Sequence, residues 1–203
     1  AGGPVDQESP RLANALLGNP VDAAGLEITG VGPKLLFHAD TWVAWVGAQC
    51  SGTVDGKIFP GNRPVHIRKG QTLIFGAMTQ GYRIFLAVSG GIESEFILGG
   101  RGSHLRADIG DRVVQKGDVL YLPQANLAEE KPLFKKLNSA AADFPKWSIA
   151  SPARPGKAVQ IIKALPSIHF NLLSAEEQSL LSKTIWTVSS QSNRMGIMAK
   201  THF

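Results

Sequence analysis

Two glycine-rich stretches carry the side chains best suited to hold a small anion. Gly81-Tyr82-Arg83 enters a predicted strand that ends at Ser89-Gly90-Gly91, and paired glycines permit backbone conformations and ligand approaches that other residues exclude. The second stretch, Leu98 to His104, holds an arginine and a serine among its glycines. Its N–H groups and guanidinium can bind a carboxylate or a phosphate. A plain β-turn explains the same glycines equally well, and the sequence contains no Walker motif.

A second candidate site lies beside the helix predicted over residues 7–18. Four polar side chains crowd the start of this helix: Asp6, Glu8, Ser9 and Arg11. Free N–H groups at a helix N-terminus, next to an arginine, can bind a small polar ligand. Helix capping is the alternative, since Ser9 is a good N-cap, Pro10 suits the first helical position and Gly18 suits the C-terminal cap.

Other classes of site find less support in the sequence. The histidines lack metal-ligand spacing, and the single cysteine, Cys50, excludes an internal disulfide and a cysteine-rich metal centre. The net charge of +5 comes from scattered lysines and arginines, whereas nucleic-acid binders cluster arginines and interleave aromatic residues. We therefore expect no metal site and no nucleic-acid partner.

The composition indicates a globular, mainly β protein. The 203 residues are 43% hydrophobic and 18% charged and include 22 glycines and 12 prolines. This balance suits short strands joined by turns and argues against a helical bundle. No apolar run reaches the roughly 18 residues that a bilayer span needs, and no signal peptide is visible at the N-terminus. We expect a cytoplasmic protein without a membrane partner.

Strand patterns recur about every ten residues, a spacing typical of a barrel or sandwich rather than of βαβ units. The predicted strands cover residues 26–29, 34–38, 42–46, 65–67, 72–75, 83–88, 118–122, 159–162 and 185–188. A capping box from Ser174 to Glu177 predicts a further helix that continues to about Leu181.

Five stretches, taken together, resemble one protein family. They are Gly2 to Asn19, Ala24 to Pro33, Gly81 to Ile92, Leu98 to Ser103 and Ser192 to Gly196. Their residues, order and rough spacing are similar to those of the biotin-dependent carboxyltransferase family, also called allophanate hydrolase subunit 2. The family includes one subunit of the bacterial 5-oxoprolinase complex and the carboxyltransferase part of urea amidolyase.

The resemblance implies cyclophilin-like β-barrel lobes with short helices. On this basis we expect a first lobe region over residues 1–123, a proline-rich linker or excursion over 124–157, and part of a second lobe over 158–203. Family members usually begin earlier and continue further. The second lobe is therefore expected to be incomplete, and the chain to be a fragment or a short form.

The resemblance also implies a function in a heteromeric enzyme. The first hypothesis is a subunit of an ATP-dependent 5-oxoprolinase, a hydrolase that opens 5-oxo-L-proline to L-glutamate. Its partners would be an allophanate hydrolase subunit 1-like protein and a LamB-type third subunit. ATP would be used by the complex, and no cofactor would be bound covalently.

Two alternatives remain open. In the first, the chain is a carboxyltransferase component that acts on urea or another small amide. Biotin would then be on a separate carrier, because Ala77-Met78 is followed by Thr79 rather than by a biotinyl lysine. In the second, it is a regulatory partner of a kinase-inhibitor protein and has no catalytic role.

Residue chemistry at the family-motif positions predicts a binding site for a small carboxylate or amide substrate. The predicted residues are Asp6, Ser9, Arg11, Glu27, Arg83, Gly90, Gly91, Arg101, Ser103 and Arg194. We expect Arg83, Arg101 and Arg194 to hold the anion around one shared cleft. Asp6 and Glu27 would orient them or a substrate amide. A structural salt bridge between strands is the alternative for each arginine.

Overall fold

The computed structural model describes residues 3–103, 107–123, 132–139, 143–151, 163–192 and 196–201. The chain divides into two compact units, one formed by Gly2–Gly156 and the other by Lys157–Phe203. Within the described ranges, no helix has the length and apolar character needed to cross a membrane.

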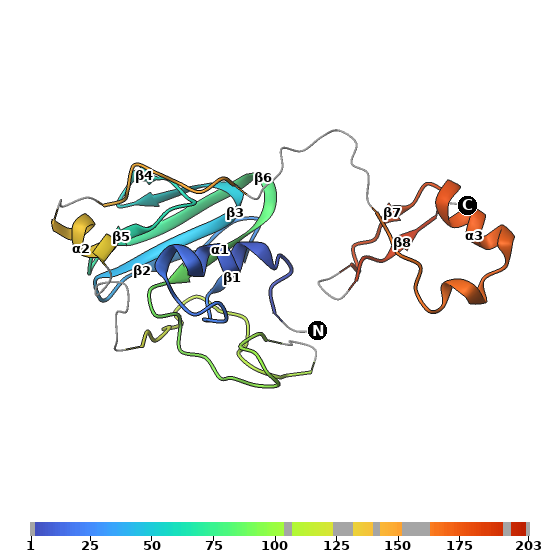
Figure 1. The fold of residues 1–203 in the computed structure, drawn as a ribbon, viewed down its shortest axis with the longest axis horizontal. Helices are drawn as coiled ribbons and strands as arrows, with labels where there is room; N and C mark the ends of the chain where they lie inside the picture. Colours follow the sequence, from blue (N-terminus) through green and yellow to red (C-terminus); the bar gives the residue numbers. More distant parts are fainter. Residues whose placement is uncertain are drawn as a thin grey trace. The chain divides into compact units, whose positions relative to one another are not determined.

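The first unit is built around one antiparallel sheet. Its two long central strands, β3 (Thr41–Val54) and β6 (Thr72–Val88), pair with each other (Figure 1). The shorter strands are β1 (Leu26–Thr29), β2 (Lys34–Leu36), β4 (Lys57–Phe59) and β5 (Val65–Ile67). β1 and β2 pair with β6, whereas β4 and β5 pair with β3. The expected mainly β fold with short helices is confirmed, and over the described residues the sheet does not close into a barrel.

Irregular pairing bends the two long strands near their middle. The register shifts three times between Gly47 and Gly52, and such bulges bend and twist a strand locally. Gly47 has a φ of 130°, and a Cβ there would lie 2.5 Å from the carbonyl oxygen of Arg83. Only glycine fits this close approach. The strands predicted separately over 72–75 and 83–88 are parts of one strand, β6.

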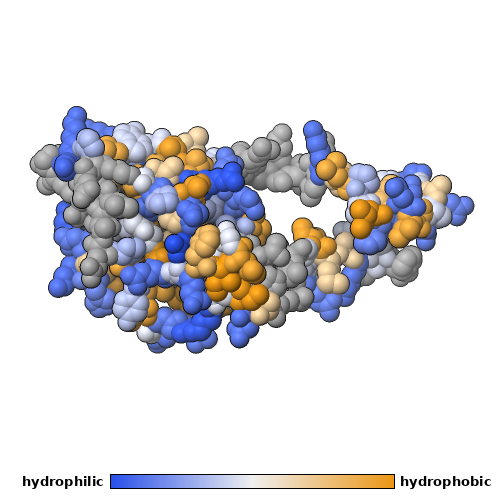
Figure 2. Space-filling view, turned by 60° about the horizontal axis from the view of Figure 1, so that its bottom comes forward, coloured by the Kyte–Doolittle hydropathy of each residue, from blue (hydrophilic) through white to orange (hydrophobic). Residues whose placement is uncertain are grey.

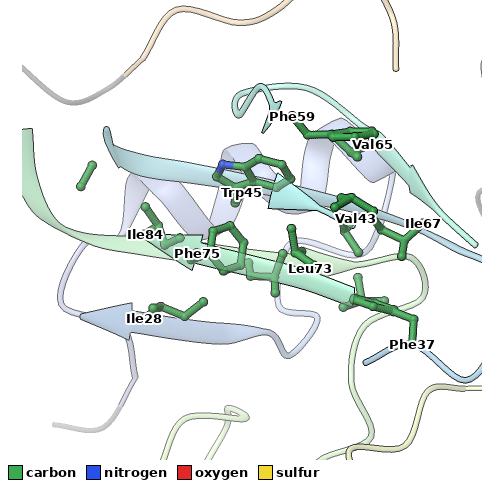
Figure 3. Close-up of a cluster of buried hydrophobic side chains, with 14 residues drawn as sticks. Ile28, Phe37, Val43, Trp45, Phe59, Val65, Ile67, Leu73, Phe75 and Ile84 are labelled. Atoms are coloured by element: carbon green, nitrogen blue, oxygen red, sulfur yellow. The ribbon is translucent and has the colours of Figure 1, made fainter. Parts of the chain in front are cut away.

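The two faces of the sheet bury separate apolar clusters. Figure 3 shows the larger cluster, in which Trp45 meets Phe75 edge to face with ring centroids 5.3 Å apart. Side chains alternate along a strand, so Trp42 lies in the cluster on the opposite face. Residues of helices α1 (Glu8–Leu17) and α2 (Pro132–Ser139) complete that second cluster.

Helix α1 begins at Glu8, which corrects the prediction that Ser9 is its N-cap and Pro10 its first residue. The Asp6 carboxylate accepts hydrogen bonds from the N–H groups of Glu8, at 2.9 Å, and Ser9, at 3.2 Å, and from the Ser9 hydroxyl. A charged acceptor serves these free N–H groups better than a hydroxyl does. Ser9 therefore lies inside the first turn, where it is buried. Gly18 ends the helix with a φ of 64°, as predicted.

The part of 124–157 that the structure describes packs on the first unit. Helix α2 turns Phe134 inward, where it is 1% exposed and its ring centroid lies 4.9 Å from that of Trp42. The side chain therefore belongs to the same buried cluster as the sheet residues beneath α1.

Residues 143–151, here called the strap, bond to the sheet next to β5. The His66 N–H donates to the Asp143 carbonyl at 2.7 Å, and the Arg63 guanidinium donates to the Pro145 carbonyl at 2.9 Å. The strap contains no helix or strand. Several of its backbone groups instead bond to the segment before and within β5.

The second unit is small. It contains the 3₁₀ helix η1 (Phe170–Leu172), helix α3 (Ala175–Lys183) and a ribbon of β7 (Thr187–Val188) and β8 (Ala199–Lys200). The predicted capping box is confirmed, with the Ser174 N–H donating to Glu177 at 2.7 Å and the Glu177 N–H donating to Ser174 at 3.3 Å. Helix α3 ends two residues beyond the predicted Leu181. The strand predicted over 185–188 is reduced to its last two residues, and 159–162 lies outside the described residues.

The strand predicted over 118–122 is wrong, because this segment follows a turn at 116–117 and contains no helix or strand. The Asp118 carboxylate accepts hydrogen bonds from the Gln115 N–H, at 2.7 Å, and from Arg112, at 2.6 Å. Tyr121 is 66% exposed. A run of β-forming residues becomes a strand only where it finds a partner and a face to cover.

Candidate functional site

A cavity of about 290 Å³ lies between the loop that follows α1 and the turn that follows β6. Its lining is mostly apolar side chains and glycine. The polar side chains of the lining are Asp22, Glu93, Ser94 and Arg101. A concave site with a few converging polar groups is the usual form of a small-molecule site.

Two asparagines hold the wall of this cavity in place. The buried Asn14 amide donates to the Ala23 carbonyl at 3.0 Å. The Asn19 amide donates to the Asn14 side-chain oxygen at 3.0 Å and to the Val88 carbonyl at 2.8 Å. Its oxygen accepts the Gly90 N–H at 2.9 Å. This linked set of bonds joins the end of α1 to the end of β6 and makes the wall rigid.

The predicted glycine pair allows the chain to turn sharply at the end of β6. Gly90 and Gly91 have φ values of 82° and 86°. A Cβ at Gly91 would lie 3.2 Å from the Cβ of Ala23. The pair therefore brings the backbone close to the loop after α1 and directs the next residues, Ile92 to Ser94, along the cavity.

Arg101 supplies the positive charge of the cavity. Its guanidinium donates to the Ser94 carbonyl and lies 5.6 Å from the centroid of the Phe96 ring. The Ser94 hydroxyl donates in turn to Asp111 at 2.6 Å. These contacts position the arginine side chain, which has five N–H donors and can use the others for a ligand.

The cavity combines one guanidinium with two carboxylates, those of Asp22 and Glu93. A guanidinium binds a carboxylate through two parallel hydrogen bonds, and a carboxylate accepts hydrogen bonds from amide N–H groups. This set matches a small ligand that carries a carboxylate together with an amide N–H. It can bind and orient such a molecule.

A second polar group forms at the other end of α1. Glu27 accepts the Val5 N–H at 2.8 Å and lies 3.7 Å from the Arg83 guanidinium. Arg83 also donates to the Thr29 hydroxyl at 2.5 Å. Because β1 and β6 are paired strands, this is the cross-strand salt bridge that the sequence left open as an alternative for Arg83.

Asp6 is engaged by its own helix. Partial burial opposes its ionisation, but the hydrogen bonds from the Ser9 side chain and from the N–H groups of Ser9 and Glu8 outweigh that effect. The pKa of Asp6 therefore lies below its ordinary value. Capping, the alternative to ligand binding at this helix end, explains these contacts.

The structure separates the predicted binding residues. Gly90 and Arg101 line the cavity, and Gly91 lies beside it. The residues at the opposite end of α1 are Asp6, Ser9, Glu27 and Arg83. Arg11 is exposed on α1, Ser103 follows Arg101 in its loop, and Arg194 lies outside the described residues. Arg101 lines this cavity and Arg83 is not among its lining residues. The cleft predicted for the arginines and the role of each residue in binding stay predictions.

The sequence analysis missed Asp22, Glu93 and Ser94 as cavity residues. A signal for Glu93 and Ser94 was present, because they lie two and three positions after the glycine pair, whose turn directs the next residues. Asp22 follows Asn19-Pro20, which marks only a change of chain direction. Its approach to the glycine pair depends on the asparagine contacts, which the sequence does not reveal.

Within the part of the chain that the structure describes, no three histidine, cysteine, aspartate or glutamate side chains are grouped to hold a metal ion. Burial raises the pKa of the Cys50 thiol. A raised pKa makes the reactive thiolate scarcer, so this residue has no features of a catalytic nucleophile.

Comparison with known proteins gives a consistent match. The family model described as "Carboxyltransferase domain, subdomain A and B" matches residues 1–201. The chain is 31% identical to urea amidolyase of Lachancea kluyveri over 207 residues, which cover 96% of this chain and 11% of that protein. It is 29% identical to a 5-oxoprolinase subunit of Escherichia coli over 197 residues, which cover 96% of this chain and 58% of that protein.

The fold is similar to that of a solved structure. The match to the crystal structure of the K. lactis urea amidolyase has a TM-score of 0.70 at 28% identity and covers 99% of this chain and 12% of that one. The chain thus spans just over half of the E. coli protein and about a tenth of each urea amidolyase.

Proposed function

Because the chain belongs to the family of carboxyltransferase domains with subdomains A and B, we propose that it is a subunit of an ATP-dependent 5-oxoprolinase complex. The complex would open 5-oxo-L-proline to L-glutamate. The E. coli relative is named as one subunit of such an enzyme, which supports a multi-subunit assembly. The proposed companions are an allophanate hydrolase subunit 1-like protein and a LamB-type third subunit.

The observation that carries this proposal is the guanidinium of Arg101 in a cavity that also holds two carboxylates. 5-Oxoproline has a carboxylate for Arg101 and a lactam N–H for Asp22 or Glu93. Urea is neutral and gives the guanidinium no carboxylate to bind. The Arg101 guanidinium therefore favours the lactam acid over urea.

In this proposal the described residues bind and orient the substrate. Hydrolysis breaks the lactam C–N bond, adds the oxygen of water to the carbonyl carbon and leaves the nitrogen as the amine of glutamate. Fixing the carboxylate and the N–H at two points limits how the lactam carbonyl can face the reacting groups of the complex. In this proposal ATP is used by the complex.

A second candidate function is carboxyl transfer to urea or another small amide. The similarity to urea amidolyase in sequence and fold favours it. Asp22 and Glu93 can accept hydrogen bonds from the N–H groups of urea. Biotin would then be on a separate carrier.

Replacing Arg101 tests the first proposal. In the full chain assembled with its companion subunits, Arg101→Ala should lower kcat/KM for ATP-dependent 5-oxoproline turnover at least tenfold. The reason is the loss of a charged hydrogen bond worth about 1.5–3 kcal/mol. Arg112→Ala is the matched control, because Arg112 is exposed, pairs with Asp118 and does not line the cavity.

Ligand binding separates the two candidate functions. Calorimetry should show that 5-oxoproline binds the full chain more tightly than 2-pyrrolidone, the same lactam without a carboxylate, and that Arg101→Ala removes the difference. Unchanged turnover by a folded Arg101→Ala variant would exclude this arginine from the site. Binding of urea without binding of 5-oxoproline would favour carboxyl transfer.

A further inference from the structure

Leu98 stands at the tip of a tight turn next to the cavity. The Ile97 N–H donates to the Gly100 carbonyl at 2.8 Å, and the Gly100 N–H donates to the Ile97 carbonyl at 3.1 Å. The two residues between them, Leu98 and Gly99, have φ values of 50° and 81°. Positive φ at both central positions is the mark of a type I′ turn, for which Asn-Gly is a favoured sequence.

Folding alone does not explain a leucine at this position. The left-handed conformation brings Cβ too close to the following carbonyl oxygen, a cost that asparagine and glycine bear more easily. Burial does not offset this cost, because Leu98 is 90% exposed. The turn and the solvent both favour another residue at this position.

The neighbouring residues extend this apolar tip. Phe96 is 56% exposed and lies under the Arg101 guanidinium. The hydrogen bond from Ser94 to Asp111 ties the turn to a second loop, in which Val113 is 58% exposed. In Figure 2, hydrophobic residues gather on the face that carries these loops. Contiguous apolar groups on a surface mark an interaction site.

The sequence around the turn contains more acidic than basic residues. Residues 93–111 contain four carboxylates, those of Glu93, Glu95, Asp108 and Asp111, against the two guanidinium groups of Arg101 and Arg106. The whole chain has a net charge of +5, so this segment departs in sign from the rest. A binding surface with an apolar centre and a basic rim would complement it.

We propose that the hairpin of residues 96–101 docks on the subunit 1-like protein of the proposed complex, which receives Leu98 in an apolar pocket rimmed by lysine and arginine side chains. The existence of that subunit rests on the proposed function. Arg101 belongs both to this hairpin and to the cavity wall. Docking would therefore bring the partner to the cavity, where side chains of the partner can become part of the proposed substrate site.

The variant Leu98→Asn tests the proposal without harming the turn, because asparagine suits the left-handed position. Calorimetric titration of the full chain with the purified subunit 1-like protein, at low and high salt, measures the dissociation constant. The wild-type chain should bind, more weakly at high salt. Leu98→Asn should bind at least tenfold more weakly, with a melting temperature no lower than that of the wild type. Ile58→Asn is the control, since Ile58 is 76% exposed on β4, outside the hairpin, and should bind like the wild type.

Three results would overturn the proposal in distinguishable ways. Wild-type affinity in Leu98→Asn would remove the hairpin from the interface and leave the complex standing. A dissociation constant that does not change with salt would contradict the basic rim proposed for the partner's pocket. A wild-type chain that does not bind the subunit 1-like protein would overturn both the proposed complex and the docking.

Discussion

Arg83 and Arg101 show how one residue type serves two different purposes in this chain. Arg83 is held between two strands by Glu27 and Thr29. The Arg101 guanidinium donates to the Ser94 carbonyl and lies over the Phe96 ring, and Arg101 lines a cavity. Both were predicted as anion holders, because their glycine-rich neighbourhoods look alike in the sequence. The difference lies in their partners, which are distant along the chain for Arg83 and lie within the same loop for Arg101.

Asp6 supports a prediction about pH. Its pKa is lowered in the folded protein, so its contribution to stability is complete above the unfolded value, about 3.9, and is lost as the pH falls through the folded value. Asp6→Asn should lower the free energy of unfolding by about 0.5–1 kcal/mol at pH 7, the lower part of the range for a helix cap on a partly exposed group. Urea denaturation at pH 7 and pH 3 measures the effect.

The control for Asp6 is Glu8→Gln, which removes a carboxylate from the first turn of α1 and leaves the Asp6 cap in place. Its effect should stay within about 0.5 kcal/mol. The stability difference between Asp6→Asn and the wild type should shrink at pH 3. An equal difference at both pH values would contradict a role for the ionised carboxylate.

At the scale of elements, the strap shows how a segment without helix or strand stabilises a sheet. The strap uses its backbone carbonyls as acceptors for Arg63 and His66. The Phe144 ring meets Phe59 edge to face, with centroids 5.5 Å apart. Such a segment has no periodic apolar pattern. The sequence therefore predicted only a linker or an excursion for it.

Truncating Phe134 tests the contribution of α2. Phe134→Ala removes a ring that is 1% exposed and packs on Trp42, so the free energy of unfolding should fall by about 3–5 kcal/mol. Leu133→Ala is the matched control, because that neighbouring side chain is 37% exposed, and it should cost less than about 1 kcal/mol. Equal losses in urea denaturation would show that α2 does not pack as described.

At the scale of the molecule, the chain forms two units of very different character. The first has clusters of buried side chains on both faces of its sheet. Among the described residues of the second, only Ser189 is buried. Stability should therefore be concentrated in the first unit.

Hydrogen exchange can measure this difference. Leu73→Ala, at a fully buried position of β6, should destabilise the first unit by about 2–5 kcal/mol and speed amide exchange throughout β3 and β6. Exchange in α3 should not change. Leu180→Ala, at a 59% exposed position of α3, should leave β3 and β6 unaffected. A change in α3 on mutation of Leu73 would show that the two units unfold together.

The sequence by itself determined the local features. The strands over 26–29 and 65–67 show local patterns of β-forming residues, although their hydrogen-bond partners, β6 and β3, are other segments of the chain. The glycine cap at Gly18 and the capping box at Ser174 depend on residues close together in the chain. Hydrogen bonds and φ angles over a few residues produce them. The family was also predictable, because five motifs kept their order.

Only the tertiary structure determined where the strap packs and which residues line the cavity. Asn19 reaches Gly90 across 71 positions, and Arg83 reaches Thr29 across 54. These contacts depend on the register of β6 against β1 and on the bulges beside Gly47, which the alternation of side chains does not specify. Burial and hydrogen bonding between distant segments therefore determined which of the predicted residues lie close together. Local sequence patterns do not specify how far apart such segments lie in the folded chain.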